Sequence, residues 1–541
     1  MTGAKADLGR RRRLLGGAVC GLVAAFAGLA VAELAAAVVR PEAAPVTAVG
    51  GTVVDLTPTA VKEWAIRQFG TADKLVLALG IVLVLGAVAA AAGVLAVRRL
   101  PAGLAVAGAF GLVGALAATS RPEASWRDAL PSLAGGLAAA GVLYLLVRAL
   151  RRPRPAGAPP GGAGAMDRRG FGRLVAATLA ASAGIGYAGR RLGAYGSLGA
   201  GASRAGLVLP PPDVPAPPVP PGAEPAVRGT SPFLTAAGDF YRVDTALVVP
   251  RVDADTWRLR IHGEGVARPL ELDLRALLAR PLVEHDITLT CVSNEVGGPY
   301  AGNARWLGVR LADLLHEAGV RPPSRGGPAD QLVARSVDGM TIGTPVETVM
   351  DGREALLAVG MNGEPLPFAH GFPVRMVVPG LYGYVSACKW LRELHLTTFS
   401  AYDAYWVRRG WAAQAPVKTQ SRIDTPRPSA EPLAGQVAVA GVAWAQHRGI
   451  ARVEVRVDGG PWQEARLADA DGVDTWRLWS WPWEAAPGRH TLQVRATDGG
   501  GAVQTEEVRP PVPDGATGLH TVAVHVRPRP AAAAAAAART G

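Results

Sequence analysis

Cysteine and histidine are scarce in this chain, and their scarcity excludes several kinds of metal site. The 541 residues include three cysteines, Cys20, Cys291 and Cys388. No CxxC, CxxCH or Cys/His zinc spacing occurs, which argues against c-type haem, cysteine-ligated iron–sulfur clusters and zinc fingers. The first histidine is His262, so the apolar segments before it cannot hold a bis-histidine haem. A disulfide between Cys291 and Cys388 stays open for an oxidising compartment.

Surplus positive charge is absent from the C-terminal two thirds of the chain. Residues 1–193 carry 22 Lys and Arg against 9 Asp and Glu, whereas the remaining residues carry 34 against 35. The surplus therefore lies beside the apolar N-terminal runs, as membrane topology requires. A nucleic-acid groove would need that charge on the folded domain, so we expect no nucleic-acid partner.

Four apolar segments dominate residues 1–150. They cover residues 14–39, 74–97, 102–119 and 130–148, and each approaches or exceeds the ~20 residues that a helix needs to cross a bilayer. Arginines mark one side of these segments: Arg10 to Arg13, Arg98, Arg99, Arg148, Arg151, Arg152 and Arg154. The positive-inside rule then predicts four transmembrane helices whose arginine-bearing ends face the cytoplasm.

A basic segment rich in alanine and glycine follows at residues 151–195. It opens with a Pro/Gly/Ala linker, after which Arg168 and Arg169 precede Phe171 and a mild apolar stretch. This pattern resembles an internal twin-arginine export signal, with Gly172 where leucine is common. An ordinary fifth transmembrane segment is the alternative. Both readings predict a multi-pass protein of the cell membrane whose soluble part is extracytoplasmic.

The soluble part divides by composition. A Pro-rich linker over residues 196–230 predicts a semi-rigid spacer that lifts the next domain off the membrane. Residues 231–420 mix strand-like runs with helical ones such as "VRLADLLHEAG", which predicts an α+β domain. Residues 421–528 alternate apolar and polar residues between glycine turns, which predicts an immunoglobulin-like β-sandwich. The Ala-rich residues 529–541 predict a disordered tail.

Cys291 is the first candidate for chemistry. It ends the β-type run in "DITLTCVSNEVGG" and is followed by polar and glycine residues, a pattern typical of a side chain that faces a site. A buried, inert thiol is the alternative.

Three cation- or ligand-capable side chains form the second candidate group. His370, Arg375 and Lys389 lie within 20 residues of one another, among glycines and prolines. Cations and exposed backbone amides suit an anionic, phosphate-bearing ligand. A loop layer with solvated charges is the alternative.

Taken together, these stretches resemble the sulfite oxidase family of molybdopterin enzymes. The resemblance rests on "TLTCVSNEVGG", "WLGVRLADLL", "MNGEPLPFAHGFPVRMVVPG" and "KWL", which occur in the family's order, and covers about residues 235 to 528. It implies an α+β molybdopterin-binding catalytic domain and an immunoglobulin-like dimerisation domain. It also implies a molybdenum–pyranopterin cofactor and an oxidoreductase.

The same resemblance assigns the site residues. Cys291 matches the family's equatorial thiolate ligand of molybdenum, and a soft thiolate suits a metal that cycles by two electrons. Arg242 matches a catalytic arginine near the metal. The residues that match or flank cofactor contacts are Ser293, Asn294, His370, Arg375, Gly380, Ser386 and Lys389. The stretch from Gly380 to Lys389 is one residue longer than common forms.

Two departures from the family pattern leave the substrate open. Glu295 and Val296 stand where animal and plant sulfite oxidases carry a basic residue, and Asp244 stands where a histidine is usual. An acid at position 295 would repel a sulfite dianion in a low-dielectric pocket. Basic residues of the connector could restore a positive pocket, or could be solvated or interdomain; these are Arg408, Arg409, Lys418 and Arg422.

The favoured function is a membrane-anchored oxygen-atom-transfer enzyme acting on a small substrate such as sulfite. The chain has no cytochrome b5-like domain, so an external electron carrier, a cytochrome or a quinone, is expected, as is a homodimer through the sandwich. A sulfoxide or N-oxide reductase of the same superfamily is an alternative, although its small members lack the sandwich. A non-catalytic, membrane-tethered binding protein on the same fold is the other alternative.

Overall fold

The computed structural model describes residues 2–58, 61, 64–65, 68–69, 73–121, 124–151 and 168–529. The chain divides into two compact units. The first comprises Met1–Ala202 and Thr245–Val249, and the second comprises Ser203–Asp244 and Pro250–Gly541. Most of the predicted 151–167 linker and nearly all of the predicted tail fall outside the described residues.

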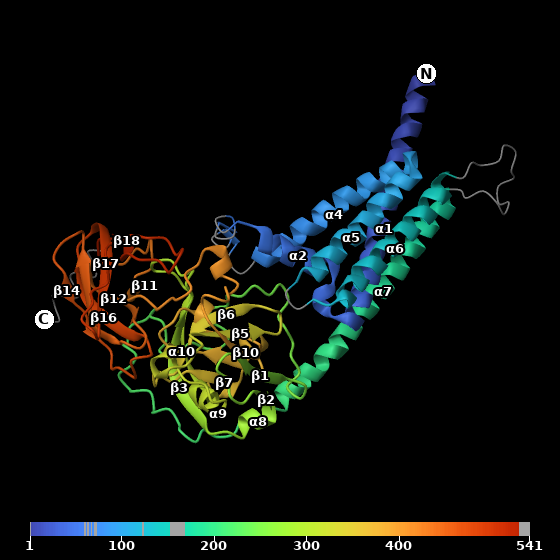
Figure 1. Ribbon diagram of the computed structural model, residues 1–541. Coiled ribbons are helices and arrows are strands. Elements are labelled where there is room, and N and C mark those ends of the chain that lie inside the picture. Colours follow the sequence, from blue (N-terminus) through green and yellow to red (C-terminus); the bar gives the residue numbers. More distant parts are fainter. Residues whose placement is uncertain are drawn as a thin grey trace. The chain divides into compact units, whose positions relative to one another are not determined.

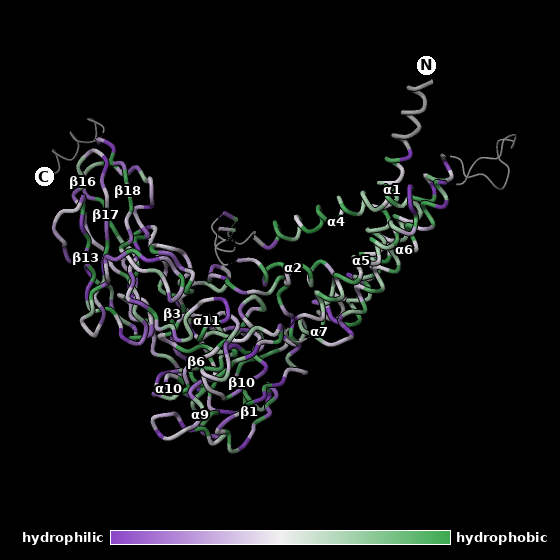
Figure 2. The backbone as a smooth tube through the Cα atoms, turned by 45° about the horizontal axis from the view of Figure 1, so that its top comes forward, coloured by the Kyte–Doolittle hydropathy of each residue, from purple (hydrophilic) through white to green (hydrophobic). Residues whose placement is uncertain are grey.

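The first unit is helical, and four of its helical segments are long and apolar enough to cross a membrane. These segments are Arg13–Val39, Lys74–Arg98, Leu100–Thr119 and Trp126–Arg151. Their apolar residues form the green lengths of the tube in Figure 2. The helices of the unit are α1 (Thr2–Val39), α2 (Pro45–Leu56), α4 (Asp73–Arg98), α5 (Leu100–Thr119), α6 (Leu130–Arg151) and α7 (Arg168–Ala205), with 3-10 turns η1 (Pro41–Ala43) and η3 (Trp126–Ala129).

Small residues let these helices pack backbone to backbone. A Cβ added at Gly28 of α1 would lie 2.6 Å from the carbonyl oxygen of Gly135 in α6. Gly21 of α1 and Gly93 of α4 approach one another in the same way. Close approach at small residues is the usual means by which helices associate in lipid, where apolar burial offers little. Cys20 is fully buried in this packing, so it faces other helices.

Helix α7 is not among the four candidate spans. Its residues form one continuous helix, as a fifth transmembrane segment would, but glycines and arginines lower its mean hydropathy. Gly189 packs against Leu34 of α1, so α7 belongs to the bundle up to Ala202. The twin-arginine reading stays a prediction.

The second unit begins with two mixed or antiparallel sheets that form one core (Figure 1). One sheet has the order β2-β1-β10-β5-β6, and in the other β3-β4-β7-β8 are neighbours and β9 pairs with β7. The strands are β1 (Arg258–Gly263), β2 (Leu270–Asp273), β3 (Leu282–Thr290), β4 (Ala301–Arg310), β5 (Gln331–Ser336), β6 (Thr341–Pro345), β7 (Leu356–Met361), β8 (Glu364–Pro365), β9 (Arg375–Val377) and β10 (Leu391–Thr397).

Short helices connect these strands. They are α8 (Leu274–Leu278), α9 (Leu311–Glu317), α10 (Val346–Val349) and α11 (Gly383–Ser386), with the 3-10 turns η4 (Pro323–Arg325), η5 (Phe368–His370) and η6 (Val407–Arg409). The predicted amphipathic helix is α9, which buries Leu311, Leu314 and Leu315. Val309 has the spacing of that helix and instead lies near the end of β4, because β4 pairs with β7 through residue 310.

The Pro-rich segment does not stand free, which corrects the prediction of a spacer. Helix α7 runs to Ala205, and the segment after it lies along the edge of β3. The backbone N–H groups of Asp213 and Val214 donate to the carbonyl of Leu282. The carbonyl of Pro217 accepts a hydrogen bond from Arg305 at 2.8 Å. Proline runs keep the backbone extended, and such a backbone can satisfy an exposed strand edge.

The C-terminal part of the second unit is rich in β-strands. Its two four-stranded sheets share a core of valines and tryptophans, including Val453, Val494, Trp479 and Trp481. One sheet contains β11 (Gln420–Thr425), β12 (Gly435–Trp444), β16 (Arg477–Ala485) and β15 (Arg466–Leu467). The other contains β14 (Gln463–Glu464), β13 (Ile450–Val457), β17 (Gly488–Asp498) and β18 (His520–Val526).

Candidate active site

Cys291 is the first residue after β3 and opens a tight loop that returns to β4. Its backbone N–H donates to the carbonyl of Tyr300 at 2.9 Å. Asn294 closes the loop, because its own N–H donates to the carbonyl of Cys291 at 3.0 Å and its Oδ1 accepts from the N–H of Tyr300 at 2.7 Å. The expected cofactor contact Asn294 is therefore engaged in shaping the loop that presents the sulfur.

The sulfur of Cys291 is buried and free. Cys388 is also free, so the disulfide alternative is wrong for this structure. Burial raises the pKa of the Cys291 thiol, while hydrogen bonds from the backbone and side chain of Ser293 and the charge of Lys389 oppose that rise. A buried neutral thiol is a poor nucleophile, but a bound metal ion would replace its proton. Ser293 lies where it would stabilise the resulting thiolate.

Arg375, on β9, is a buried cation without a carboxylate partner in the described part of the chain. Only 3% of its surface is exposed. Its Nη1 donates to the carbonyl of His370 at 3.2 Å, its guanidinium lies 4.9 Å from the ring centre of Trp306, and its Nε has no acceptor. Burial lowers the pKa of Arg375 to about 10, still well above neutral. A buried charge in this state needs an anion from outside the chain.

His370, at the end of η5, is buried and neutral. Burial, followed by the charges of Arg375 and Lys389, lowers its pKa to about 4. Its Nε2 lies 2.9 Å from the carbonyl of Ala237, so this nitrogen carries the proton. Its Nδ1 has no hydrogen-bond partner among the described residues. His370 therefore offers a buried lone pair to a hydrogen-bond donor.

Lys389 brings these groups together. Its charge acts to lower the pKa of the Cys291 thiol and of His370, and the charge of Arg375 acts to lower the pKa of Lys389. Gly371 makes the approach feasible: its φ is +108°, and a Cβ there would lie 3.0 Å from the Cα of Lys389 and 3.1 Å from the Cβ of Arg375. Burial lowers the pKa of Lys389 to about 8, against the influence of its partner Asp244.

Asp244 holds two cations at the edge of this cluster. Its carboxylate lies 3.0 Å from Nζ of Lys389 and 2.9 Å from Nε of Arg242. Arg242 keeps 35% of its side-chain surface exposed, whereas Lys389 keeps 10%. One of the two acids that depart from the family pattern, Asp244, is therefore paired, which offsets its own charge. The repulsion expected from Glu295 stays a prediction.

Two of the predicted cofactor contacts, Ser386 and Gly380, contact residues outside this cluster. The hydroxyl of Ser386 is buried and lies 3.0 Å from the carbonyl oxygens of both Leu381 and Tyr382. A Cβ at Gly380 would lie 2.7 Å from Nη1 of Arg353 and 3.2 Å from the Cβ of His447. Both residues hold the chain around α11, and their contact with a cofactor stays a prediction.

Two tyrosines near the sulfur were missed from the sequence. Burial, and then the proximity of Cys291, raises the pKa of Tyr241. Burial also raises the pKa of Tyr382 to about 12, with Cys291 a smaller contributor. Tyr241 adjoins Arg242 in the sequence, which was the available signal. The position of Tyr382 near Cys291 depends on the return of the chain at α11.

The C-terminal sheets support the strand that carries Cys291. The side-chain amide of Gln446 donates to the carbonyl of Thr288 at 2.9 Å and to the hydroxyl of Thr290 at 3.0 Å. The N–H of Trp476 donates to the hydroxyl of Thr288 at 2.7 Å. Residues remote in sequence thus fix the last residues of β3.

The connector residues act between the two parts of the second unit. Arg422 donates to the carbonyl of Gly298 and pairs with Asp424. Lys418 pairs with Asp514 at 2.9 Å, while Arg408 and Arg409 lie over tyrosine rings. These contacts favour the interdomain reading of Arg422 and Lys418 over a substrate pocket.

Asp474 links the two parts through His285 and also contacts His447 of its own part, and its removal has a predictable pH dependence. Its carboxylate lies 3.1 Å from His285 of β3 and 3.1 Å from His447. Although burial alone would lower it, the hydrogen bond and charge of Asp474 raise the pKa of His285 above 6.5. This stabilisation is complete below the unfolded pKa and is lost as pH rises through the folded pKa.

We expect Asp474→Asn to lower the free energy of unfolding by about 1.5–3 kcal/mol at about pH 5.5, and by less at about pH 9. Urea unfolding of the full chain, followed by a signal from the second unit, measures this, with Glu484→Gln, at an exposed carboxylate of β16, as the matched control. Equal costs at both pH values would contradict the assignment.

Comparison with known proteins agrees with this geometry. A family model described as "Oxidoreductase molybdopterin binding domain" matches residues 246–406. The chain is 33% identical over 313 residues to human mitochondrial sulfite oxidase, covering 49% of this chain and 56% of that protein. It is 31% identical over 325 residues to chicken sulfite oxidase, covering 51% and 69%. It therefore spans just over half the length of its mammalian relatives.

A bacterial relative and a solved structure add to the comparison. The chain is 33% identical over 159 residues to the uncharacterized oxidoreductase YuiH of Bacillus subtilis, covering 29% of this chain and 74% of that protein. Among solved structures, the sulfane dehydrogenase SoxCD from Paracoccus pantotrophus is similar, with 25% identity and a TM-score of 0.47. That likeness covers 56% of this chain and 85% of that chain.

Proposed function

Because this chain belongs to the sulfite oxidase family of molybdopterin oxidoreductases, we propose that it moves an oxygen atom to or from a small substrate by two-electron chemistry. It is an enzyme, and its cofactor is molybdenum–molybdopterin. The observation that carries the proposal is the free, buried sulfur of Cys291 in one cluster with Arg375, a cation that has no carboxylate partner among the described residues.

The chain's own groups fit this cofactor. Cys291 would hold the metal, with Ser293 donating to its thiolate. Arg375 would bind the cofactor's phosphate, since a buried guanidinium without a counter-charge needs an anion. The Nδ1 of His370 would accept a pterin N–H. When bound, the cofactor supplies the two-electron oxygen-atom transfer, and the protein supplies orientation and charge.

Arg242 would bind the substrate's negative charge. It is the most exposed cation of the cluster, and Asp244 fixes its guanidinium from one side. Because Asp244 is shared with Lys389, its negative charge is compensated, so an anion such as sulfite stays a candidate substrate. Lys389, whose pKa is lowered to about 8, would give or take a proton near the sulfur, whereas the raised pKa values of Tyr241 and Tyr382 keep their hydroxyls protonated.

Reduction of a sulfoxide or an N-oxide is the second candidate function. Oxidation would send two electrons to a cytochrome or quinone, and reduction would take two electrons from such a carrier. Anaerobic assays distinguish these directions: a substrate that reduces an added dye through the protein indicates oxidation, and a reduced dye consumed with sulfoxide indicates reduction.

We also propose the setting of the enzyme. The four apolar helices would anchor it in the cell membrane as a multi-pass protein. The arginine distribution supports an extracytoplasmic catalytic domain over residues 231–420. Residues 421–528 would form an immunoglobulin-like domain that pairs in a homodimer. Reporter fusions after residues 151 and 230 test the orientation, and light scattering of the purified protein tests the dimer.

Metal and pterin analysis tests the proposal directly. We expect protein from cells grown with molybdate to contain molybdenum and pterin in amounts stoichiometric with the chain. A Cys291→Ser variant of equal yield should lose molybdenum. A wild-type protein without metal after growth in molybdate would refute the proposed function.

A further inference from the structure

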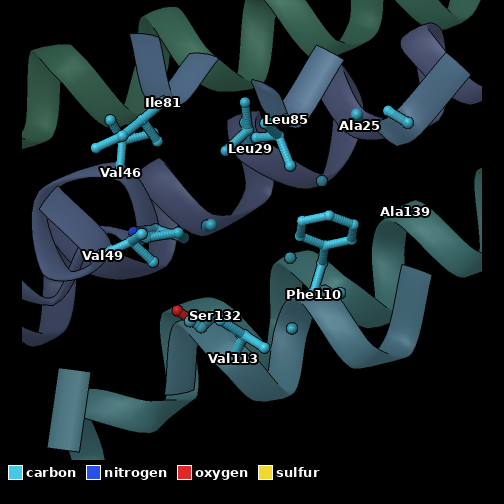
Figure 3. Close-up of a pocket in the computed structure, with 18 of the residues that line it drawn as sticks. Ala25, Leu29, Val46, Val49, Ile81, Leu85, Phe110, Val113, Ser132 and Ala139 are labelled. Carbon is cyan, nitrogen blue, oxygen red and sulfur yellow. The ribbon is translucent and has the colours of Figure 1, made fainter. Parts of the chain in front are cut away.

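A cavity of about 620 Å³ lies inside the helical unit, among α1, α2, α4, α5 and α6. Figure 3 shows side chains from these five helices around it, among them Leu29, Val49, Leu85 and Phe110. Its volume falls in the range of about 300–1,000 Å³ that is usual for small-molecule sites. The pocket is partly open, and its apolar walls offer packing contacts to an apolar molecule that enters it.

The lining of the cavity restricts the charge of that molecule. The lining residues are Gly, Ala, Val, Leu, Ile, Pro and Phe, with Ser132 the one polar side chain among them. No lining residue could pair with a phosphate or an ammonium group. A neutral molecule fits this environment, whereas the charged head group of a phospholipid does not.

Ser132 supplies a single hydrogen-bonding group. It is 2% exposed, and its hydroxyl has no partner in the part of the chain that the structure describes. A serine inside a helix commonly bonds a carbonyl of the preceding turn, and Ser132 does not. Ser132 lies among the lining residues drawn in Figure 3, and its hydroxyl, unpaired among the described residues, is the one side-chain donor of that lining.

We propose that this cavity binds a prenylated quinone, whose ring carbonyl accepts a hydrogen bond from Ser132 and whose apolar body fills the space between the helices. The choice of a quinone rests on the proposed function, because a substrate oxidised with a water oxygen releases two electrons and two protons. A quinone takes up two electrons and two protons to become a quinol, so the two half-reactions balance.

Calorimetric titration of the full chain in detergent with a benzoquinone that carries one isoprene unit tests the proposal. We expect saturable binding that Ser132→Ala weakens about three- to ten-fold, as the loss of one hydrogen bond predicts. Ala25→Phe and Val49→Phe, which fill the cavity from two helices, should abolish it. The matched controls are Ser182→Ala, on a helix that does not line the cavity, and the exposed Leu83→Phe on α4; both should bind as the wild type does.

A phospholipid also carries carbonyl groups, in its esters. A parallel titration with short-chain phosphatidylglycerol therefore distinguishes quinone binding from phospholipid binding. Binding of the phospholipid without the quinone, or no saturable binding of the quinone, would overturn the proposal. Quinone binding unaffected by the cavity-filling variants would do so as well. The titrations are repeated with Cys291→Ser, which should bind the quinone normally. If Cys291→Ser loses dye-linked activity and still binds the quinone, the two measurements are independent. A failure of the proposed function can then be distinguished from a failure of the quinone proposal.

Discussion

Cys291→Ser is expected to lower dye-linked turnover by about 10³-fold or more, since the proposed ligand of the reacting metal is removed. The serine oxygen is a harder ligand than sulfur, and the serine hydroxyl is a far weaker acid than the thiol. Because the hydroxyl keeps its proton, it donates less to a metal that cycles by two electrons. The hydrogen bonds from Ser293, arranged around a sulfur atom, would also be mismatched. Steady-state assays with a dye, together with the visible absorption of the thiolate–metal bond, measure the effect.

Cys388→Ala provides a matched control for that variant. Cys388 is also a free, buried cysteine, but its sulfur contacts the carbonyl of Lys389 at 3.7 Å and occupies the protein core. We expect this variant to keep its molybdenum and most of its activity. A Cys291→Ser enzyme that turns over at the wild-type rate would remove the basis of the assigned mechanism.

Arg375→Met is expected to have opposite effects on the cofactor-free and cofactor-loaded forms. Without the cofactor, Arg375 is a buried charge with no counter-ion among the described residues, so an apolar side chain of similar length should stabilise that form by about 1–3 kcal/mol. With the cofactor, the same change removes the cation that binds the phosphate, and pterin content should fall about 10- to 100-fold. Thermal unfolding of protein made in cells that cannot synthesise the pterin, and pterin analysis of protein made in cells that supply it, measure the two effects.

Arg310→Met separates this effect from the general loss of an arginine. Arg310 forms a two-point ion pair with Glu354 and keeps 35% of its side chain exposed, so its replacement should change stability by less than about 1 kcal/mol in both forms. If Arg375→Met destabilises the cofactor-free protein, the guanidinium has a counter-charge in that form and the phosphate assignment loses its support.

The cysteine and the cationic residues of the candidate site could be singled out because the patterns that mark them are local in sequence. Cys291 follows a strand and precedes a polar, glycine-containing loop, and His370 and Arg375 lie five residues apart around Gly371. Long apolar runs likewise identified the helices, because a membrane span is a property of a single continuous segment.

The Pro-rich segment shows where such reasoning fails. Its composition is typical of a free spacer, yet the edge of β3 offers N–H and carbonyl groups that its extended backbone can satisfy. Composition describes the segment alone, and its docking depends on a strand about 70 residues later.

The sequence by itself determined the apolar helices, the cysteine that would hold the metal and the cationic residues around it, because each depends on neighbouring residues. Only the tertiary structure decided that Asp244 pairs with both Arg242 and Lys389, that Gln446 and Trp476 support the strand of Cys291, and that Ser132 opens onto an apolar cavity. These contacts join residues far apart in the chain, and burial and charge pairing depend on which segments the fold brings together.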